Sequence, residues 1–424
     1  MNKKIYFLTT AYFCFLILIL IIYGYTPQND SEGYIEYAKL CLEEHQPYPA
    51  TSLIEHSSFI WNIGAINIIE LSLWLFDSIY PVLVLMCLLK ALTAALIAKI
   101  AQTLFNDRVA ILSSVLFVLY PNNWGQSTML LSEIPSIFFA LSATYITIKT
   151  NNIKLLFVSG ILLFLSNWFR SIAIVFMLSL ILYYLIFERQ HILRKICPML
   201  CGLFISILIV GSLSYMRTGH FIYSGNSLWY NMAYNCYDGA KDVHFGEAPY
   251  QKGTPMYIEN MDELDCFERN DIWKQRCIHW IMDNKMEYLK KIPKRIILMY
   301  QNDIDNIAFA LKDKSNSANN YVTIPIRNMH NEIGNLSGVQ YLALISFIIY
   351  VCILLLFLYS IIVSINNNAW RNTFIPLAII IIGTASISLL IHGETRFKVP
   401  FMPFIIILAS YGLTSIKALQ KSYN

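Results

Sequence analysis

The chain has 424 residues, of which 56% are hydrophobic and only 14% are charged. A soluble globular domain carries roughly 25% charged residues, and the mean hydropathy here is +0.51, so the composition excludes a soluble protein and predicts an integral membrane protein. The formal net charge of +4 is spread along the chain without a basic block, which excludes a nucleic-acid-binding protein.

The first predicted element is a membrane span near residues 5–23. Lys3 and Lys4 precede an apolar run of about 20 residues, the length that crosses a bilayer. This run is long for the hydrophobic part of a signal peptide and lacks a convincing small-residue cleavage site. We therefore expect an uncleaved first span.

A short acidic stretch, PQNDSEGYIEYAKL, opens the polar segment 24–57 behind this span. Asp30 and Glu32 stand at the membrane exit, and Tyr34 follows in a run of helical pattern. Asp30 could cap the helix that begins here. It could also be a general base that takes a proton from an attacking hydroxyl. Both interpretations remain open at this point.

Ten apolar runs of spanning length or slightly less are predicted as membrane spans. They lie near 5–23, 78–102, 108–123, 133–149, 153–168, 170–187, 195–215, 340–365, 372–391 and 397–416. The apolar stretch 58–76 contains Asn62, Asn67 and Glu70, and we predict that it lies at the membrane interface. The predicted fold class is therefore an all-α polytopic bundle of about ten membrane helices, with interfacial helices and a larger external loop region.

Basic residues give this bundle an orientation. With 58–76 left out of the spans, the turns on one side hold Arg108, Lys149, Lys154, Arg189, Arg194, Lys195, Arg371, Lys417 and Lys421. The short turns on the opposite side hold almost no Lys or Arg except Arg170, Arg396 and Lys398. By the positive-inside rule the basic turns and both termini are cytoplasmic. The predicted parts are an N-terminal membrane module 1–215, an external region 216–338 and C-terminal membrane helices 339–424. The turn 121–132 is also external.

A second acid stands at the start of the span near 133–149, in the stretch SEIP. Glu133 at a helix N-terminus is favoured by the helix dipole, and Ser132 is a plausible cap. The alternative is that Glu133 faces Asp30 across a cavity and completes an acidic site.

Cations stand in two external turns where the orientation rule leaves few of them. Arg170, in NWFRSIAI, suits a bidentate contact with phosphate, although it could also be a snorkelling surface residue. In HGETRFKVP, Arg396 and Lys398 could meet a phosphate or pyrophosphate, and Glu394 could orient Arg396. His392, in the same stretch, fits a polar interfacial residue better than a ligand.

The external region 216–338 contains a run of helical pattern that ends in a basic cluster. Its residues Lys290, Lys291, Lys294 and Arg295 suit a helix on anionic headgroups or over a lipid phosphate. A solvated helix face is the other interpretation.

Nine cysteines occur in the chain, and four of them lie in polar segments. Cys41, Cys236, Cys266 and Cys277 could form disulfides in one of three pairings if these segments face an oxidising compartment. Metal ligation is weakly indicated, because the histidines are scattered and no HExxH or CxxC motif occurs. A divalent cation stays possible as a cofactor.

Several of these stretches together resemble a known family. An acidic PxxD…Y…A stretch follows the first span, SEIP lies two spans later, WFRS follows a short span, and the chain closes with GETRFKVPFMPFIIILASYGL. In order and sidedness they are similar to the GT-C superfamily of membrane glycosyltransferases. The nearest branch is glycosyltransferase family 39, which includes protein O-mannosyltransferases and lipid A aminoarabinose transferases.

The resemblance implies an inverting transferase that uses polyprenyl-monophosphate sugars. It places Asp30 as the catalytic base, Glu133 as the acid of the second external turn, and Arg170 and Arg396 near the polyprenyl phosphate. The chain departs from the family at Phe397, where tyrosine is usual. Glu32 leaves open which acid beside the first span is the base.

The predicted function is thus transfer of a sugar to a hydroxyl of a lipid, glycan or protein acceptor. The predicted place is the external face of a membrane, in a bacterium the inner (plasma) membrane. Two alternatives are an O-antigen-type polymerase or ligase, which uses pyrophosphate-linked glycans, and a lipid-linked sugar transporter. The polar residues gather at one face and not at mid-span, which disfavours the transporter.

Overall fold

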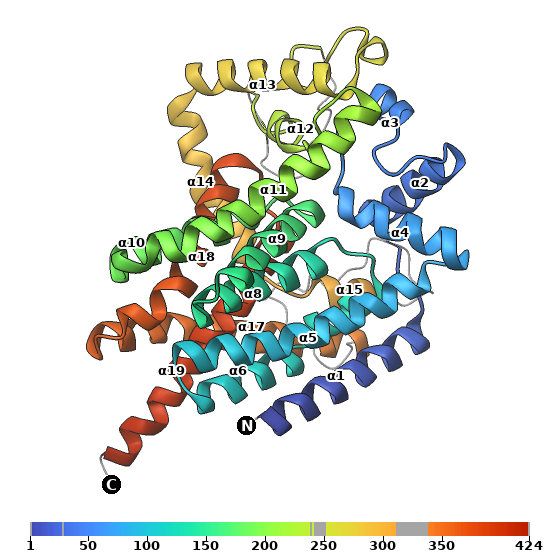
Figure 1. Ribbon diagram of the computed structural model, residues 1–424. Helices are drawn as coiled ribbons and strands as arrows, with labels where there is room; N and C mark the ends of the chain where they lie inside the picture. Colours follow the sequence, from blue (N-terminus) through green and yellow to red (C-terminus); the bar gives the residue numbers. More distant parts are fainter. Residues whose placement is uncertain (1, 28, 238–239, 241–251, 311–337, 423–424) are drawn as a thin grey trace, which may run out of the picture.

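The computed structural model describes residues 2–27, 29–237, 240, 252–310 and 338–422, and within these residues it contains helices and no strand. The predicted all-α polytopic membrane fold is confirmed (Figure 1). Part of the predicted external region 216–338, residues 311–337 among it, lies outside the described residues.

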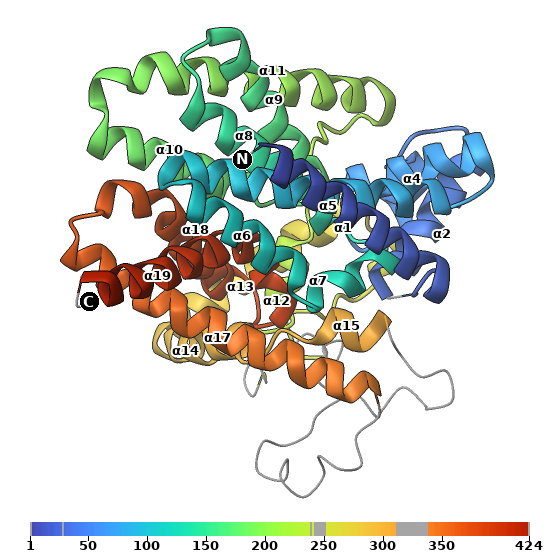
Figure 2. The ribbon, with the colours of Figure 1, turned by 90° about the horizontal axis from the view of Figure 1, so that it is seen from below.

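Each of the ten predicted spans overlaps a helix. These helices are α1 (Asn2–Tyr23), α5 (Tyr80–Leu104), α6 (Asp107–Leu119), α8 (Glu133–Lys149), α9 (Ile153–Phe169), α10 (Ala173–Phe187), α11 (Ile192–Thr218), α17 (Gly338–Asn366), α18 (Trp370–Leu390) and α19 (Met402–Ser422). Figures 1 and 2 show them packed into one bundle.

Six helices in the described part of the chain are long and apolar enough to cross a membrane. They are α1, α5, α11, α17, α18 and α19, the last together with the preceding 3-10 helix η6 (Thr395–Phe401). The shorter α8 passes the same test only together with the segment Asn122–Thr128, from which it is bent by 117°. The protein is therefore a multi-pass membrane protein, and the count of ten spans stays a prediction.

The remaining helices lie in the segments between the ten helices that overlap predicted spans. They are α2 (Asn29–Glu43), α3 (Thr51–His56), α4 (Ile63–Phe76), α7 (Asn122–Gly125), η1 (Gln126–Thr128), η2 (Arg189–His191), α12 (Leu228–Ala233), η3 (Met261–Glu263), α13 (Cys266–Asp283), α14 (Lys285–Tyr300) and α15 (Asp305–Ala310). Figure 1 shows α12 and α13 at one end of the molecule, with α14 leading from them back to the bundle.

Helix α4 is the stretch predicted to lie at the interface. Its 14 residues span about 21 Å, which is less than the hydrocarbon thickness. Its polar side chain Asn67 is bound by a loop: its Oδ1 accepts from the Tyr48 amide at 2.8 Å, and its Nδ2 donates to the Tyr48 carbonyl at 3.0 Å. The polar residues that made this stretch ambiguous therefore have partners within the fold.

The predicted basic helix is α14, and its cations divide between two faces. Lys291 and Arg295 are buried, whereas Lys290 and Lys294 are exposed. Lys291 donates to the carbonyl of Asn235 at 3.1 Å, and Arg295 donates to the carbonyl of Ser388 at 3.1 Å. Two of the four cations thus join α14 to the rest of the protein.

Close packing of α9 on α11 depends on two glycines. A Cβ at Gly160 would lie 1.9 Å from the Met199 carbonyl oxygen, and one at Gly202 would lie 2.1 Å from that of Phe157. Small residues let membrane helices approach in this way.

Gly160→Val is therefore expected to lower the free energy of unfolding by about 1–3 kcal/mol, because the added methyl groups force the two backbones apart. Thermal unfolding in detergent measures the effect. Gly338→Val is the matched control, since nothing lies within 4 Å of a Cβ there. Equal melting temperatures for the two variants would show that α9 and α11 tolerate separation.

Candidate active site

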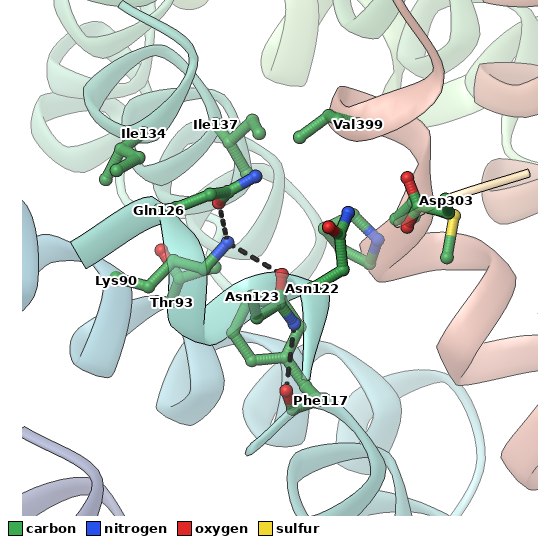
Figure 3. Close-up of a pocket in the computed structure, with 12 residues that line it drawn as sticks. Lys90, Thr93, Phe117, Asn122, Asn123, Gln126, Ile134, Ile137, Asp303 and Val399 are labelled. Atoms are coloured by element: carbon green, nitrogen blue, oxygen red, sulfur yellow. Dashed lines mark hydrogen bonds between the residues drawn. The ribbon is translucent and has the colours of Figure 1, made fainter. Parts of the chain in front are cut away.

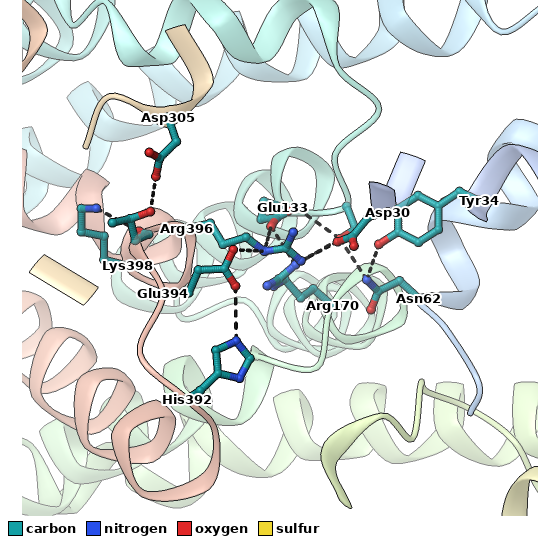
Figure 4. A network of polar contacts seen from close by, with 12 residues as sticks. Asp30, Tyr34, Asn62, Glu133, Arg170, Asp305, His392, Glu394, Arg396 and Lys398 are labelled. Atoms are coloured by element: carbon teal, nitrogen blue, oxygen red, sulfur yellow. Dashed lines mark hydrogen bonds and ion pairs between the residues drawn. The ribbon is translucent and has the colours of Figure 1, made fainter. Parts of the chain in front are cut away.

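The candidate active site is centred on an ion pair between Asp30, near the N-terminus, and Arg396, near the C-terminus. Asp30 lies in the first turn of α2, where the helix dipole favours an acid. Arg396, on η6, donates from Nη2 to Asp30 Oδ2 at 2.5 Å. Both side chains keep partial access to solvent, with 33% of Arg396 and 23% of Asp30 exposed. Figure 4 shows the pair at the middle of a wider network.

Glu133 joins a second guanidinium to this pair. It is the first residue of α8 and is buried. Its Oε1 accepts from Arg170 Nη1 at 2.7 Å and lies 3.9 Å from Arg396 Nε. The two arginines and the two acids predicted from the sequence are thus brought together by the fold.

Glu394 supplies a third carboxylate. Its Oε1 lies 3.8 Å from Arg396 Nε, and its Oε2 lies 3.4 Å from Nε2 of the buried His392. The ring of Phe397, the position that departs from the family pattern, lies 5.8 Å from the Arg170 guanidinium and 5.9 Å from that of Arg396. An aromatic face there supports both cations.

A neutral hydrogen-bond relay fixes the side of the network that α2 contributes. Asn62 Nδ2 donates to the Tyr34 hydroxyl at 2.8 Å and to Ser132 Oγ at 3.1 Å. Burial raises the pKa of Tyr34 to about 12, and the charges of Asp30 and Glu133 add to this rise. Tyr34 therefore stays a neutral phenol at physiological pH.

Glu32 takes a different position from Asp30. It lies one residue beyond Ser31 on α2, is exposed, and is not among the residues labelled in Figure 4. The geometry therefore favours Asp30 over Glu32 as the acid that meets a substrate. The roles of Asp30, Glu133, Arg170 and the remaining site residues stay predictions.

The ammonium group of Lys398 binds three groups of the protein itself. It is fully buried, and its ammonium donates to the carbonyls of Asn302 at 2.6 Å and Thr395 at 2.8 Å and lies 3.0 Å from Asp303 Oδ1. Asp303 also accepts from the hydroxyl of Tyr120. In this structure Lys398 holds the segment before α15 against η6, so a contact with donor phosphate would require it to leave these partners.

Asp305 lies beside this segment and was not singled out from the sequence. Its Oδ2 accepts a hydrogen bond from Thr395, next to Arg396. Burial raises the pKa of the Asp305 carboxyl, while the Thr395 hydrogen bond and the charge of Lys398 oppose the rise. The signal in the sequence is a pair of acids, DID, separated by two residues from the end of the amphipathic α14.

The bent segment before α8 holds several parts of the site together. The backbone amide of Thr26, close before Asp30, donates to the Thr128 carbonyl at 2.8 Å. Asn122 Oδ1 accepts from the Ile307 amide at 3.2 Å, and a Cβ at Gly125 would lie 2.2 Å from the Asn306 carbonyl oxygen. The approach of α15 thus requires glycine at position 125.

Lys90 supports this bent segment from within the bundle. It is a buried lysine on α5. Its ammonium donates to Asn123 Oδ1 at 2.8 Å and to Gln126 Oε1, and lies 5.0 Å from the centre of the Phe117 ring. Figure 3 shows these amides pointing at Lys90. A cavity of about 10 Å³ beside them has room for about one water molecule.

Lys90→Met is expected to lower the free energy of unfolding by about 1–3 kcal/mol, because two buried amide oxygens lose their donor. Thermal unfolding of the purified protein measures this. Lys99→Met on the same helix is the control, since Lys99 contacts the Tyr145 ring at 5.7 Å and is less buried. A Lys90→Met protein as stable as the control would mean that the bent segment does not need the ammonium.

Comparison with known proteins bears on the part of the chain from α4 to α11. Residues 64–215 match the family model described as dolichyl-phosphate-mannose-protein mannosyltransferase. This confirms the resemblance to the GT-C membrane glycosyltransferases of the family 39 type. No curated protein matches the chain.

The matched residues include the bent segment, Glu133 and Arg170, whereas Asp30 and Arg396 lie outside them. A lipid-linked sugar donor is the general partner that the family implies. Within the described residues, no group of three His, Cys, Asp or Glu side chains is arranged to hold a metal ion. The divalent cation stays a prediction.

Proposed function

We propose that the protein is an inverting glycosyltransferase that moves a sugar from a polyprenyl-monophosphate donor to an acceptor hydroxyl. The acceptor is a lipid, a glycan or a protein, and the site faces the exterior of a bacterial inner membrane, with both chain termini cytoplasmic. The observation that carries the proposal is the direct pairing of Asp30 with Arg396, 366 residues apart in sequence. A carboxylate able to take the proton of the acceptor thus lies beside a guanidinium able to bind the leaving phosphate.

Asp30 acts as the general base in this proposal. Its carboxylate takes the proton of the acceptor hydroxyl, and the acceptor oxygen forms a bond to the anomeric carbon. The bond between that carbon and the phosphate oxygen breaks, and polyprenyl phosphate leaves with the electron pair. Attack opposite to the phosphate inverts the anomeric configuration, and one base is enough for it.

Arg396 links donor binding to the freeing of this base. In the present structure its guanidinium is occupied by Asp30 at 2.5 Å, with Glu133 and Glu394 at 3.9 and 3.8 Å. A donor phosphate that takes over the guanidinium, which suits phosphate oxygens, releases Asp30 to accept the proton. Arg170, already paired with Glu133 at 2.7 Å, is the second cation within reach of the phosphate.

An apolar groove offers a place for the prenyl chain. It has a volume of about 670 Å³ and lies between α14, α17 and α18, with a lining that includes Ile292, Ile296, Leu354, Phe357, Ile380 and Leu389. This volume is within the range of ligand sites, which is about 300–1,000 Å³.

The groove is connected to the ion network through the end of α18. Ser388, which lines the groove, accepts from Arg295 through its carbonyl. A Cβ at Gly393 would lie 2.6 Å from the Arg295 carbonyl oxygen, so the turn that leads to Arg396 packs directly on α14. A chain in the groove therefore has its end near the cation that we assign to the phosphate.

The test uses purified protein in lipid bilayers with two labelled donors, an undecaprenyl monophosphate sugar and an undecaprenyl pyrophosphate glycan. We expect consumption of the monophosphate donor alone, release of polyprenyl phosphate, and a product of inverted configuration when acceptor lipids or glycans are supplied. Turnover of the pyrophosphate donor alone would overturn the proposal in favour of a polymerase or ligase. Movement of intact donor across the bilayer without cleavage would overturn it in favour of a transporter.

A further inference from the structure

Two of the four cysteines in polar segments lie against each other. Cys236 follows α12, and Cys277 lies on α13. Both are completely buried and are not joined by a disulfide in this structure, and their side chains are in hydrogen-bonding contact. Figure 1 shows α12 directly below α13, as this contact requires.

The remaining two cysteines of that group belong to a different hydrophobic core, although Cys266 begins the helix that carries Cys277. Cys41 and Cys266 are buried in the main hydrophobic core of the bundle. Cys236 and Cys277 are members of a separate, smaller core that also contains Met256, Trp273 and Tyr288. The fold therefore selects one partner for Cys236 among the pairings that the sequence left open.

We propose that Cys236 and Cys277 form a disulfide bond in the native protein. The inference rests on the external placement of this region in the proposed function, because disulfides persist in oxidising compartments. The two thiols lose two protons and two electrons as the sulfur–sulfur bond forms. A disulfide-bonded oxidoreductase of that compartment accepts them by thiol–disulfide exchange and is itself reduced to a dithiol.

The bond would stabilise a region whose own core is small. It connects the chain after α12 to α13 and closes a long loop, and a cross-link of that kind restricts the unfolded chain most. Asn235, next to Cys236, accepts from Lys291 of α14, and Tyr288 of α14 belongs to the same small core. Helix α14 in turn forms one wall of the apolar groove, so the disulfide braces the groove as well.

The first experiment is peptide mapping of protein purified from membranes without reductant, with free thiols alkylated during denaturation. We expect a peptide pair joined through Cys236 and Cys277 that disappears after reduction. Recovery of both cysteines in alkylated form, or of either one linked to another cysteine, would overturn the proposal. This measurement uses the wild-type chain, so it does not depend on whether a variant folds.

The second experiment compares melting temperatures with and without a membrane-permeant reductant. Reductant is expected to lower the melting temperature of the wild type by several degrees and to leave Cys236→Ser and Cys277→Ser unchanged. Cys87→Ser is the matched control, because Cys87 is a buried thiol of α5 and its loss should preserve the response to reductant. A wild type that does not respond contradicts the proposed bond.

These results separate the disulfide from the transferase activity. A protein that turns over donor with both thiols reduced refutes the disulfide alone. A cross-linked protein that consumes no donor refutes the proposed function alone.

Discussion

Asp30→Asn is expected to lower kcat for sugar transfer by about 10²–10⁴-fold, the contribution of a positioned general base. Asparagine keeps the shape of the side chain but cannot accept the proton of the acceptor hydroxyl. The dissociation constant of the donor should stay the same or decrease, because Arg396 loses its ion pair at 2.5 Å and is free for phosphate. Single-turnover kinetics and donor binding measure the two effects separately.

Glu32→Gln is the matched control for this substitution. Glu32 is an exposed acid on the same helix. Glu32→Gln should therefore leave kcat and the dissociation constant of the donor near those of the wild type. Wild-type activity of Asp30→Asn would remove Asp30 as the base. Loss of activity in Glu32→Gln alone would transfer that role to Glu32.

Arg396→Ala is expected to weaken donor binding by roughly 10- to 100-fold, because hydrogen bonds to charged groups contribute about 1.5–3 kcal/mol each. The substitution also removes the cation that stabilises the departing phosphate, so kcat should fall with it. Binding of undecaprenyl phosphate itself, without the sugar, measures the first effect in isolation.

Arg371→Ala provides the comparison for this variant. Arg371 also pairs with a carboxylate, that of Glu188 at 2.5 Å, but at the opposite end of α18 from the turn that holds Arg396. Donor affinity of Arg371→Ala should equal that of the wild type. Unchanged affinity in Arg396→Ala would show that Arg396 serves to hold Asp30 and not to bind the phosphate.

The pairing of Asp30 with Arg396 also suggests an order of binding. The base is engaged by a guanidinium until an anion competes for it, so the donor should bind before the acceptor reacts. An acceptor that reached Asp30 first would meet a carboxylate whose oxygen is already hydrogen-bonded. The same ion pairs keep three carboxylates and two arginines compatible in a membrane protein, where unpaired charges are costly.

The sequence alone determined the class of this protein and the positions of its main helices. Long apolar runs predict α1, α5, α17 and α18 because a bilayer admits only a backbone whose polar groups are satisfied within the helix. The placement of Glu133 at a helix start also follows locally, because polar residues directly precede an apolar run there. Asp30 lies at the start of a run of helical pattern. The family resemblance needed the same short stretches and no tertiary information.

Only the tertiary structure decided which of these residues meet. Arg396 reaches Asp30 because packing between helices distant in sequence brings η6 and α2 together. No local sequence pattern predicts that these two residues are in contact. The sequence also did not predict that Lys398 and Arg295 are buried, or that the thiols of Cys236 and Cys277 face each other. Local sequence sets which backbone forms a helix, whereas the partner of a charged side chain depends on long-range packing, which hydrophobic periodicity does not encode.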